Sequence, residues 1–341
     1  MDRSQMKRPN PSVTCFLGAG YSFVEGVPLA KDLLRANYVL ALSEASRRRF
    51  AALRGHYEDW QQHHPGDYPE QYLGGLYMGL LGWDAPPWSW AVEYVSAVIA
   101  SAGTPPASLN RNPRYSNRLN RPSRSVVHRR FWSAVMGAAD EVAVLTTNYD
   151  ILIERALRHR AMQRPPSPGC FYGGFPHPQQ LKGAAQPFSK WSPARLIEMT
   201  GSVPIYKLHG SLNWSLAGGS LLMYQDTRAA YRDGGNAAII PPVPEKSVPN
   251  WLGTVWHEAE LALRKSDVWI ICGYSAPAYD TEVLRLLQNG STGRCRRIFL
   301  LSPDSGLLRA RWNDIAPETD IVALPGLPEG IKALSENLAA I

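Results

Sequence analysis

Cysteine is scarce in this 341-residue sequence, which contains four of them. They stand far apart without a Cys-x-x-Cys pair, so neither a disulfide framework nor a zinc site is indicated, and we expect no bound metal. Long apolar runs are also lacking, because no stretch reaches the roughly eighteen apolar residues of a membrane span. The polar start, MDRSQMKRPNPS, has no apolar signal core. We therefore expect a cytoplasmic protein without membrane contact.

Acidic residues are absent from the stretch Arg111–Arg130, although the formal net charge of the whole chain is only +7. A basic stretch of this kind is usually a solvated surface loop. Contact with nucleic acid or with an acidic partner protein is the alternative interpretation. Net charge by itself distinguishes none of these partners.

Apolar runs typical of buried strands alternate with stretches of helical spacing. The expected strands are Val13–Leu17, Glu141–Thr147, Val203–Leu208, Ala237–Ile240, Asp267–Cys272 and Arg296–Asp304. The expected helices include Leu29–Leu53, Ser89–Ala102, His128–Ala139, Ile151–His159 and Leu252–Lys265. A loop is expected over Gln163–Lys190 and a hairpin over Asn213–Tyr224.

This alternation predicts an α/β fold with a Rossmann-like, doubly wound and mainly parallel sheet. Several segments with helical spacing, and the arginine-rich stretch, lie in the sequence between two parts of the expected sheet. We therefore expect a helical insertion over residues 36–138, which leaves residues 1–35 and 139–341 to form the sheet domain.

The chain is organised around Val13–Asp32, where an apolar run ends in Gly18-Ala19-Gly20. Ser22 with Glu25 offers a capping box for the helical turn that follows. Glycines at a strand-to-helix turn let a phosphate approach the backbone, so a nucleotide is the expected ligand. The third glycine of a dehydrogenase fingerprint is replaced by Phe23, which disfavours a dehydrogenase.

Polar or glycine clusters also follow three other expected strands. They are Thr147-Asn148-Tyr149-Asp150, His209-Gly210-Ser211 and Gly273-Tyr274-Ser275. Each has a structural explanation on its own: Asn148 or Asp150 as a helix cap, His209 as a buried structural histidine, and Gly273 as a turn. Because the carboxyl ends of parallel strands share one edge of a sheet, the four clusters together favour a single site.

These clusters resemble the motifs of the sirtuin (SIR2) family. The spacing from Gly18 to Pro28 resembles its first motif, Thr146-x-Asn148-x-Asp150 its second, and Leu208-His209-Gly210 its catalytic-histidine motif. The later residues are similar to the SIR2-like NADase branch of bacterial anti-phage defence proteins; they are Ile240-Pro241-Pro242, Lys246, Trp251 and the run Gly273–Asp280. The family's zinc ribbon is missing, and Leu29-Ala30-Lys31 departs from its deacylases, which puts protein deacylation in doubt.

The resemblance implies an NAD+ glycohydrolase that cleaves its substrate, NAD+, to nicotinamide and ADP-ribose as a regulated effector of defence by NAD+ depletion. The implied catalytic residues are Asn148, which holds the ribose or the attacking water, Asp150, which supports Asn148 and the nicotinamide pocket, and His209 as general base. The residues implied to bind NAD+ are Gly18, Ala19, Gly20, Tyr21, Ser22, Pro28, Thr147, Gly210, Ser211, Gly273, Tyr274, Ser275 and Asp280.

Alternatives remain open at this point: an ADP-ribosyltransferase or sirtuin-type deacylase, and a non-catalytic sensor of NAD or ADP-ribose. A constantly active NADase would harm its own cell. The resemblance therefore implies a homo-oligomer, or control by a partner protein such as a HerA-type ATPase or another defence component. The helical insertion and its arginine-rich stretch are the candidate contact, and nucleic acid is a further candidate partner for Arg111–Arg130.

Overall fold

The structure is a computed structural model of the chain. It describes residues 10–34, 44–101, 125–163, 169–175, 179–181, 197–199, 202–217, 220–224, 236–240 and 247–341. All predicted catalytic and NAD+-binding residues lie within these ranges. Arg111–Arg124 of the arginine-rich stretch lie outside them, as do Pro241, Pro242 and Lys246 of the later motif.

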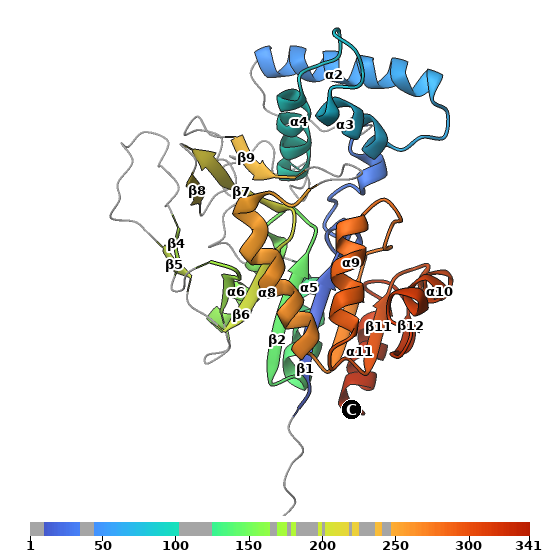
Figure 1. The fold of residues 1–341 in the computed structure, drawn as a ribbon. Helices are drawn as coiled ribbons and strands as arrows, with labels where there is room; N and C mark the ends of the chain where they lie inside the picture. Colours follow the sequence, from blue (N-terminus) through green and yellow to red (C-terminus); the bar gives the residue numbers. More distant parts are fainter. Residues whose placement is uncertain are drawn as a thin grey trace, which may run out of the picture.

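A parallel sheet of seven strands forms the centre of the molecule (Figure 1). Its order is β12-β11-β10-β1-β2-β6-β3, and all neighbouring strands are parallel. The strands are β1 (Ser12–Leu17), β2 (Glu141–Thr146), β3 (Cys170–Tyr172), β6 (Val203–Lys207), β10 (Val268–Cys272), β11 (Arg297–Leu301) and β12 (Asp320–Leu324). Their near-continuous apolar sequences suit strands that are covered on both faces.

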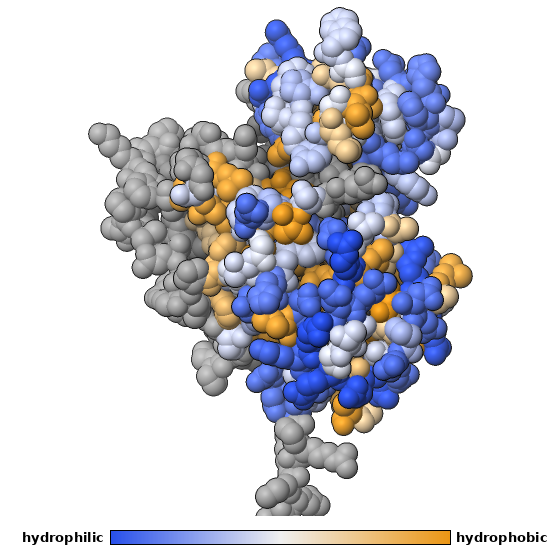
Figure 2. Space-filling model, in the orientation of Figure 1, coloured by the Kyte–Doolittle hydropathy of each residue, from blue (hydrophilic) through white to orange (hydrophobic). Residues whose placement is uncertain are grey.

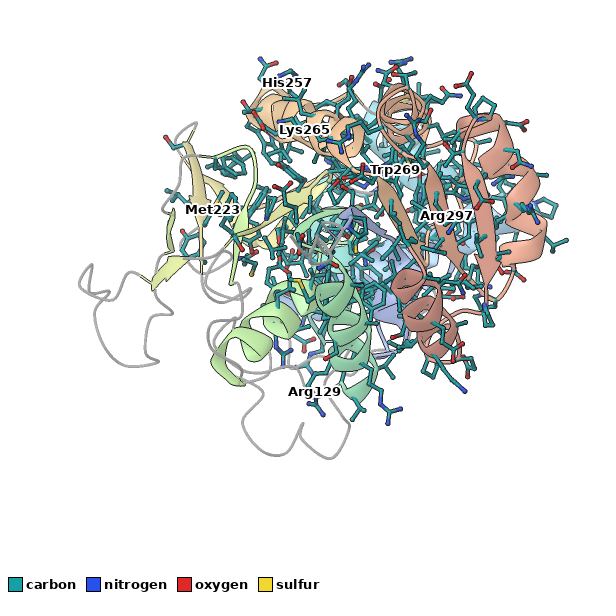
Figure 3. All side chains as sticks on the ribbon, turned by 90° about the horizontal axis from the view of Figure 1, so that it is seen from below. Arg129, Met223, His257, Lys265, Trp269 and Arg297 are labelled. Atoms are coloured by element: carbon teal, nitrogen blue, oxygen red, sulfur yellow. The ribbon has the colours of Figure 1, made fainter. Side chains whose placement is uncertain are left out.

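Helices cover both faces of the parallel sheet (Figure 3). On one face, α8 (Gly253–Lys265) packs against α9 (Thr281–Ser291), which also contacts α10 (Ser305–Ile315). On the other face, α5 (Val126–Ala138) packs against α6 (Leu152–Gln163) and α11 (Gly330–Ala339). The predicted doubly wound α/β fold is therefore confirmed.

Helix α5 packs with the sheet, although the predicted division places its residues in the helical insertion. Its side chains Phe131, Trp132 and Val135 are fully buried in the core cluster formed by the parallel strands. The connection from β1 to its parallel neighbour β2 thus ends in a helix that covers the sheet, as a crossover requires. The division at residue 139 stays a prediction.

Three helices form a separate layer beyond the carboxyl end of the sheet (Figure 1). We call α2 (Glu44–His63), α3 (Pro69–Met78) and α4 (Trp88–Ser101) the helical layer. Its core includes Phe50, Leu53, Tyr57, Tyr72, Tyr94 and Val95, and is joined from the sheet domain by Tyr149, Leu152, Leu212 and Ile239. These shared apolar contacts attach the layer to the end of the sheet that carries the predicted site.

Helices were predicted over Leu29–Leu53, and the described residues of this range confirm a helix from Glu44 but differ at both ends. A short 3-10 turn, η1, spans Ala30–Asp32, and α2 continues beyond Leu53 to His63. Helix α3 lies in an aromatic- and glycine-rich stretch where no helix was expected. Its N-terminus is favoured by Pro69 at the first position and by the Gln71 side chain, which accepts from the Tyr68 N–H at 2.6 Å.

A small antiparallel sheet follows β6. Strand β7 (Gly210–Ala217) pairs with β8 (Ser220–Met223), which confirms the predicted hairpin, and also with β9 (Asn236–Ile239). The loop predicted over Gln163–Lys190 is wrong in part, because its described residues include β3 and β4 (Gln179–Leu181), the latter paired with β5 (Ile197–Met199). Strands of three residues are too short to give a periodic signal.

The face in Figure 2 is mostly hydrophilic over α8 and α9, whereas hydrophobic residues gather over α3. Exposed hydrophobic side chains in and just after α3 are Tyr77, Met78, Leu80 and Trp83. Among the described residues, no helix combines the length and the apolar character that crossing a membrane requires.

Candidate functional site

The four polar strand ends meet at one cavity at the carboxyl edge of the parallel sheet. The cavity has a volume of about 150 Å³ and lies where β1 and β10 adjoin, the point at which the strand order reverses. The predicted residues that line it are Ala19, Ser22, Pro28, Thr147, Asn148, Asp150, His209, Gly273, Tyr274, Ser275 and Asp280. The predicted residues outside its lining are Gly18, Gly20, Tyr21, Gly210 and Ser211.

Gly18, Gly20 and Gly273 allow the first turn to touch the loop after β10. The Gly18 N–H donates to the Cys272 carbonyl at 2.9 Å, and the Gly20 N–H donates to the Gly273 carbonyl at 2.9 Å. A Cβ on Gly18 would lie 2.5 Å from the Gly273 carbonyl oxygen, and one on Gly20 would lie 2.7 Å from the Gly273 Cα. These glycines therefore serve a close backbone contact, and the N–H groups of Gly18 and Gly20 bond to protein carbonyls.

Replacing Gly273 by alanine is expected to destabilise the protein by about 3 kcal/mol. The residue has φ +67°, and an added Cβ would lie 2.3 Å from the Tyr21 backbone nitrogen. Gly306→Ala is the matched control, because its Cβ would meet nothing within 4 Å. Urea unfolding of the two variants checks the prediction, and equal stabilities would contradict it.

Ser22 does not cap a helix, so the predicted capping box with Glu25 is wrong. It lies within α1 (Ala19–Phe23), whose N-cap is Gly18. The Ser22 hydroxyl is buried and donates to Asp150 Oδ2 at 2.7 Å. A buried carboxylate from another strand end is a strong acceptor, and this contact directs the side chain away from the local backbone.

The amide of Asn148 is held in one orientation by its two donated hydrogen bonds. Nδ2 donates to the Gly18 carbonyl at 2.8 Å and to the Ser22 hydroxyl at 3.0 Å. Within the described part of the chain, no hydrogen bond reaches Asn148 Oδ1. The side chain lines the cavity, so this oxygen can accept from a ligand hydroxyl or a water.

Both oxygens of the Asp150 carboxylate accept from protein donors. Oδ2 accepts from Ser22, and Oδ1 accepts from the Leu152 N–H at 2.9 Å, at the start of α6. The helix-cap explanation of Asp150 therefore applies. The same carboxylate also orients Ser22, and through its hydroxyl the amide of Asn148.

His209 lies beside an acidic side chain that comes from a distant part of the chain. Its Nε2 is 3.9 Å from Asp280 Oδ1, and only 4% of His209 is exposed. Asp280 Oδ2 accepts from the Tyr274 hydroxyl at 2.9 Å. Burial, and then the Asp280 charge, raise the pKa of Tyr274 well above its usual range, so this phenol stays a donor. The arrangement can stabilise a protonated imidazole at the cavity wall.

Several lining residues were missed in the sequence. They are Val27, Ala30, Leu33, Ile99, Tyr149, Pro277 and Tyr279. Ile99 belongs to α4, so the helical layer supplies part of the wall. Tyr279 also donates from its hydroxyl to Glu70 Oε1 of α3 at 2.8 Å. Tyr149, Pro277 and Tyr279 lie inside quoted motifs, but no site role was predicted for them. For the others, apolar periodicity indicates burial but does not indicate which cavity a side chain faces.

Tyr21 packs behind the first turn. Its ring stacks on His128 of α5 with centroids 4.0 Å apart, and the Trp132 indole N–H donates to its hydroxyl at 2.9 Å. His128 Nε2 donates to the Tyr21 carbonyl at 2.8 Å. These contacts tie the turn between β1 and α1 to the helix that covers the sheet.

Acidification is expected to weaken the fold through His128. Burial lowers its pKa below the ordinary value of 6.5. The unfolded chain therefore binds more protons than the folded one just below pH 6.5, so the free energy of unfolding falls as the pH drops through this range and levels off above it. Melting temperatures of the wild type and of His128→Gln between pH 5 and 7.5 check this. An equally steep fall in both proteins would contradict it.

Side chains that could bind a metal ion do not cluster in the described residues. Among them, no group of three or more His, Cys, Asp or Glu side chains is placed to hold a metal ion. The four cysteines are free and buried. Burial raises the pKa of Cys15 and Cys272, so their thiols stay protonated and are poor ligands and nucleophiles.

The fold and the cavity define a Rossmann-like α/β protein with a ligand site at the switch point of its sheet. Residues 142–304 match the family model described as a SIR2-like domain. This match confirms the predicted resemblance to the SIR2 family over that part of the chain. A SIR2-like domain supports an NAD-dependent activity in general terms.

Solved structures that are similar to this chain include complexes of Sir2 homologues. A triple mutant with 2'-O-acetyl ADP ribose is 15% identical, with a TM-score of 0.44, and the match covers 100% of this chain and 96% of that chain. A Sir2 homologue in complex with NAD is 14% identical, with a TM-score of 0.43 and coverage of 97% and 89%. A comparison with curated protein sequences found no match.

Proposed function

We propose that this protein is an NAD+ glycohydrolase that cleaves NAD+ to nicotinamide and ADP-ribose. The observation that carries the proposal is the pairing of Asn148 and His209 at one cavity of a SIR2-like domain. Asn148 offers an amide oxygen that no donor among the described residues reaches, and His209 offers an imidazole beside the Asp280 carboxylate.

Hydrolysis of NAD+ would need only a few protein side chains. The bond from ribose C1' to nicotinamide breaks while positive charge spreads over the sugar, and water then adds to C1'. Asn148 Oδ1 would accept a hydrogen bond from the attacking water or a ribose hydroxyl. His209 would take the proton that the water loses, and the Asp280 carboxylate would stabilise the resulting imidazolium. Asp150 would act through Ser22, by keeping Asn148 in place.

The remaining predicted residues divide into two groups in this proposal. Those that line the cavity would contact NAD+; they are Ala19, Ser22, Pro28, Thr147, Gly273, Tyr274 and Ser275. Those outside the lining would support the loops; they are Gly18, Gly20, Tyr21, Gly210 and Ser211. The apolar wall of Val27, Leu33 and Ile99 suits the flat ring of a nicotinamide or an adenine.

NAD+ labelled in its adenine ring tests this reaction against its alternatives. Hydrolysis places the label in free ADP-ribose, in amounts equal to the nicotinamide released. Label that stays on the protein or on added nucleic acid would instead indicate an ADP-ribosyltransferase. Nicotinamide release that requires an acetyl-lysine peptide would indicate a deacylase.

We also propose that this activity is controlled in the cytoplasm by a homo-oligomer or by a partner protein such as a HerA-type ATPase. The resemblance to anti-phage defence proteins supports this role, and the helical layer with the arginine-rich stretch is the proposed contact. A fall in cellular NAD+ during phage infection is expected. An equal fall in cells that carry the His209→Ala variant would contradict the role.

A further inference from the structure

A buried ion pair lies beside the candidate site, and the proposed chemistry does not use it. Lys207 Nζ is 3.4 Å from Glu154 Oε1, and both side chains are fully buried. The free-energy cost of removing two charges from water often exceeds the gain from their attraction. Proteins with apolar residues of similar volume in place of such a pair are frequently as stable. Stability alone is therefore a weak reason for a lysine at this position.

The Lys207 ammonium has a second partner in the loop that carries Asn148. It donates a hydrogen bond to the backbone carbonyl of Asp150. Lys207 is the last residue of β6, two positions before His209, whereas Asp150 follows β2. One side chain thus connects the two strand ends that carry the proposed catalytic residues.

A second anchor holds the same loop from the other side of His209. The Tyr149 carbonyl accepts from the Leu212 N–H at 2.9 Å, and the Ser211 hydroxyl oxygen lies 3.4 Å from it. Ser211 in turn donates to Asn213 Oδ1 at 2.7 Å, and Asn213 Nδ2 donates to the Tyr172 hydroxyl at 2.9 Å. The side chains of this network are buried, where hydrogen bonds are strong and rigid.

We propose that Lys207 is a positioning residue that fixes the Asn148–Asp150 loop relative to His209. It acts through the Asp150 carbonyl and not by contact with substrate. Loss of its N–H would leave this carbonyl without the lysine donor and would loosen the path from Asp150 through Ser22 to Asn148. The kinetic part of this inference rests on the proposed NAD+ cleavage.

The decisive variant removes both charges. Lys207→Met alone would leave Glu154 buried without its counter-ion and would unfold readily. Lys207→Met combined with Glu154→Leu keeps the volume, so we expect a melting temperature within a few degrees of the wild type. Backbone amides of residues 147–152 are expected to exchange hydrogen at least about tenfold faster, while those of β10 stay unchanged.

The same double variant is expected to lower kcat for nicotinamide release by about 100-fold, the effect of a displacement of about 1 Å in an active site. KM for NAD+ should change by less than about threefold, because most lining residues lie elsewhere. Lys332→Met on α11 is the matched control, because its side chain is 87% exposed and remote from the site. This control should match the wild type in every measurement.

Wild-type exchange at residues 147–152 in the double variant would overturn the inference. Faster exchange throughout the sheet, including β10, would also overturn it by showing a general loss of stability. Hydrogen exchange does not depend on activity. A wild type that leaves NAD+ intact would therefore refute the proposed function, while exchange would still decide the role of Lys207.

Discussion

Replacing His209 by alanine is expected to slow nicotinamide release from NAD+ by about 100- to 10,000-fold, the range typical for loss of a general base. His209 is 4% exposed and lies beside Asp280. Bulk water therefore has little access to act as the base in its place. The backbone of residue 209 would keep its place in the alanine variant, because its carbonyl accepts from the Ile240 N–H at 2.9 Å. The fold should therefore persist in the variant.

Release of nicotinamide, followed by chromatography, checks the His209 prediction. His257→Ala on α8 is the matched control, because this histidine is exposed on the outer surface (Figure 3). The control should keep the wild-type rate. A His209→Ala protein that melts like the wild type and cleaves NAD+ as fast would remove the histidine from the proposed mechanism.

Replacing Asn148 by alanine is expected to lower the rate of nicotinamide release by about 100- to 1,000-fold. Loss of one preorganised polar group has an effect of this size in other enzymes. The variant loses the Oδ1 acceptor at the cavity and also the two bonds donated by Nδ2. The second loss should reduce the free energy of unfolding by about 1–3 kcal/mol. Rate and stability should therefore both fall.

Asn148→Asp tests whether the two bonds donated by Nδ2 are needed to place the oxygen acceptor. It keeps an oxygen acceptor but places a second oxygen against the Gly18 carbonyl, so the side chain should turn away and the rate should stay low. Asn289→Ala on the exposed surface of α9 is the control and should not differ from the wild type. Wild-type rates in both Asn148 variants would contradict the proposed role of the amide.

The parallel sheet and the convergence of its strand ends could be predicted from local patterns. The runs at Val13, Val142 and Val268 are apolar on both faces, which is typical of strands under two helical layers. Polar residues that directly follow such runs must lie at one edge when the strands are parallel. The cavity lined by Asn148, His209 and Gly273 follows from this geometry.

The rest depends on contacts between distant segments. Ser22 fits a local capping pattern, but the hydroxyl donates to Asp150, which no pattern within α1 can indicate. Strand β3 is only three residues long, and its place is set by pairing with β6. The Tyr279 hydroxyl donates to Glu70 of the helical layer. These residues lie far apart in the sequence, so the contact can be seen only in the tertiary structure.

The glycine turn illustrates the difference between residue type and role. The pattern Gly18-Ala19-Gly20 predicts a phosphate cradle. In the structure, the absence of Cβ atoms lets the turn contact Gly273 of the neighbouring strand end, and two of its N–H groups bond to carbonyls there. The same residues therefore align the first motif with the loop that carries Asp280.

Incubation of the purified protein with NAD+ tests the central claim most directly. The wild type is predicted to release nicotinamide and free ADP-ribose in equal amounts, and the His209→Ala variant to release both about 100- to 10,000-fold more slowly. A folded wild type that binds NAD+ but returns it intact, at the same rate as the His209→Ala variant, would contradict the proposed hydrolase.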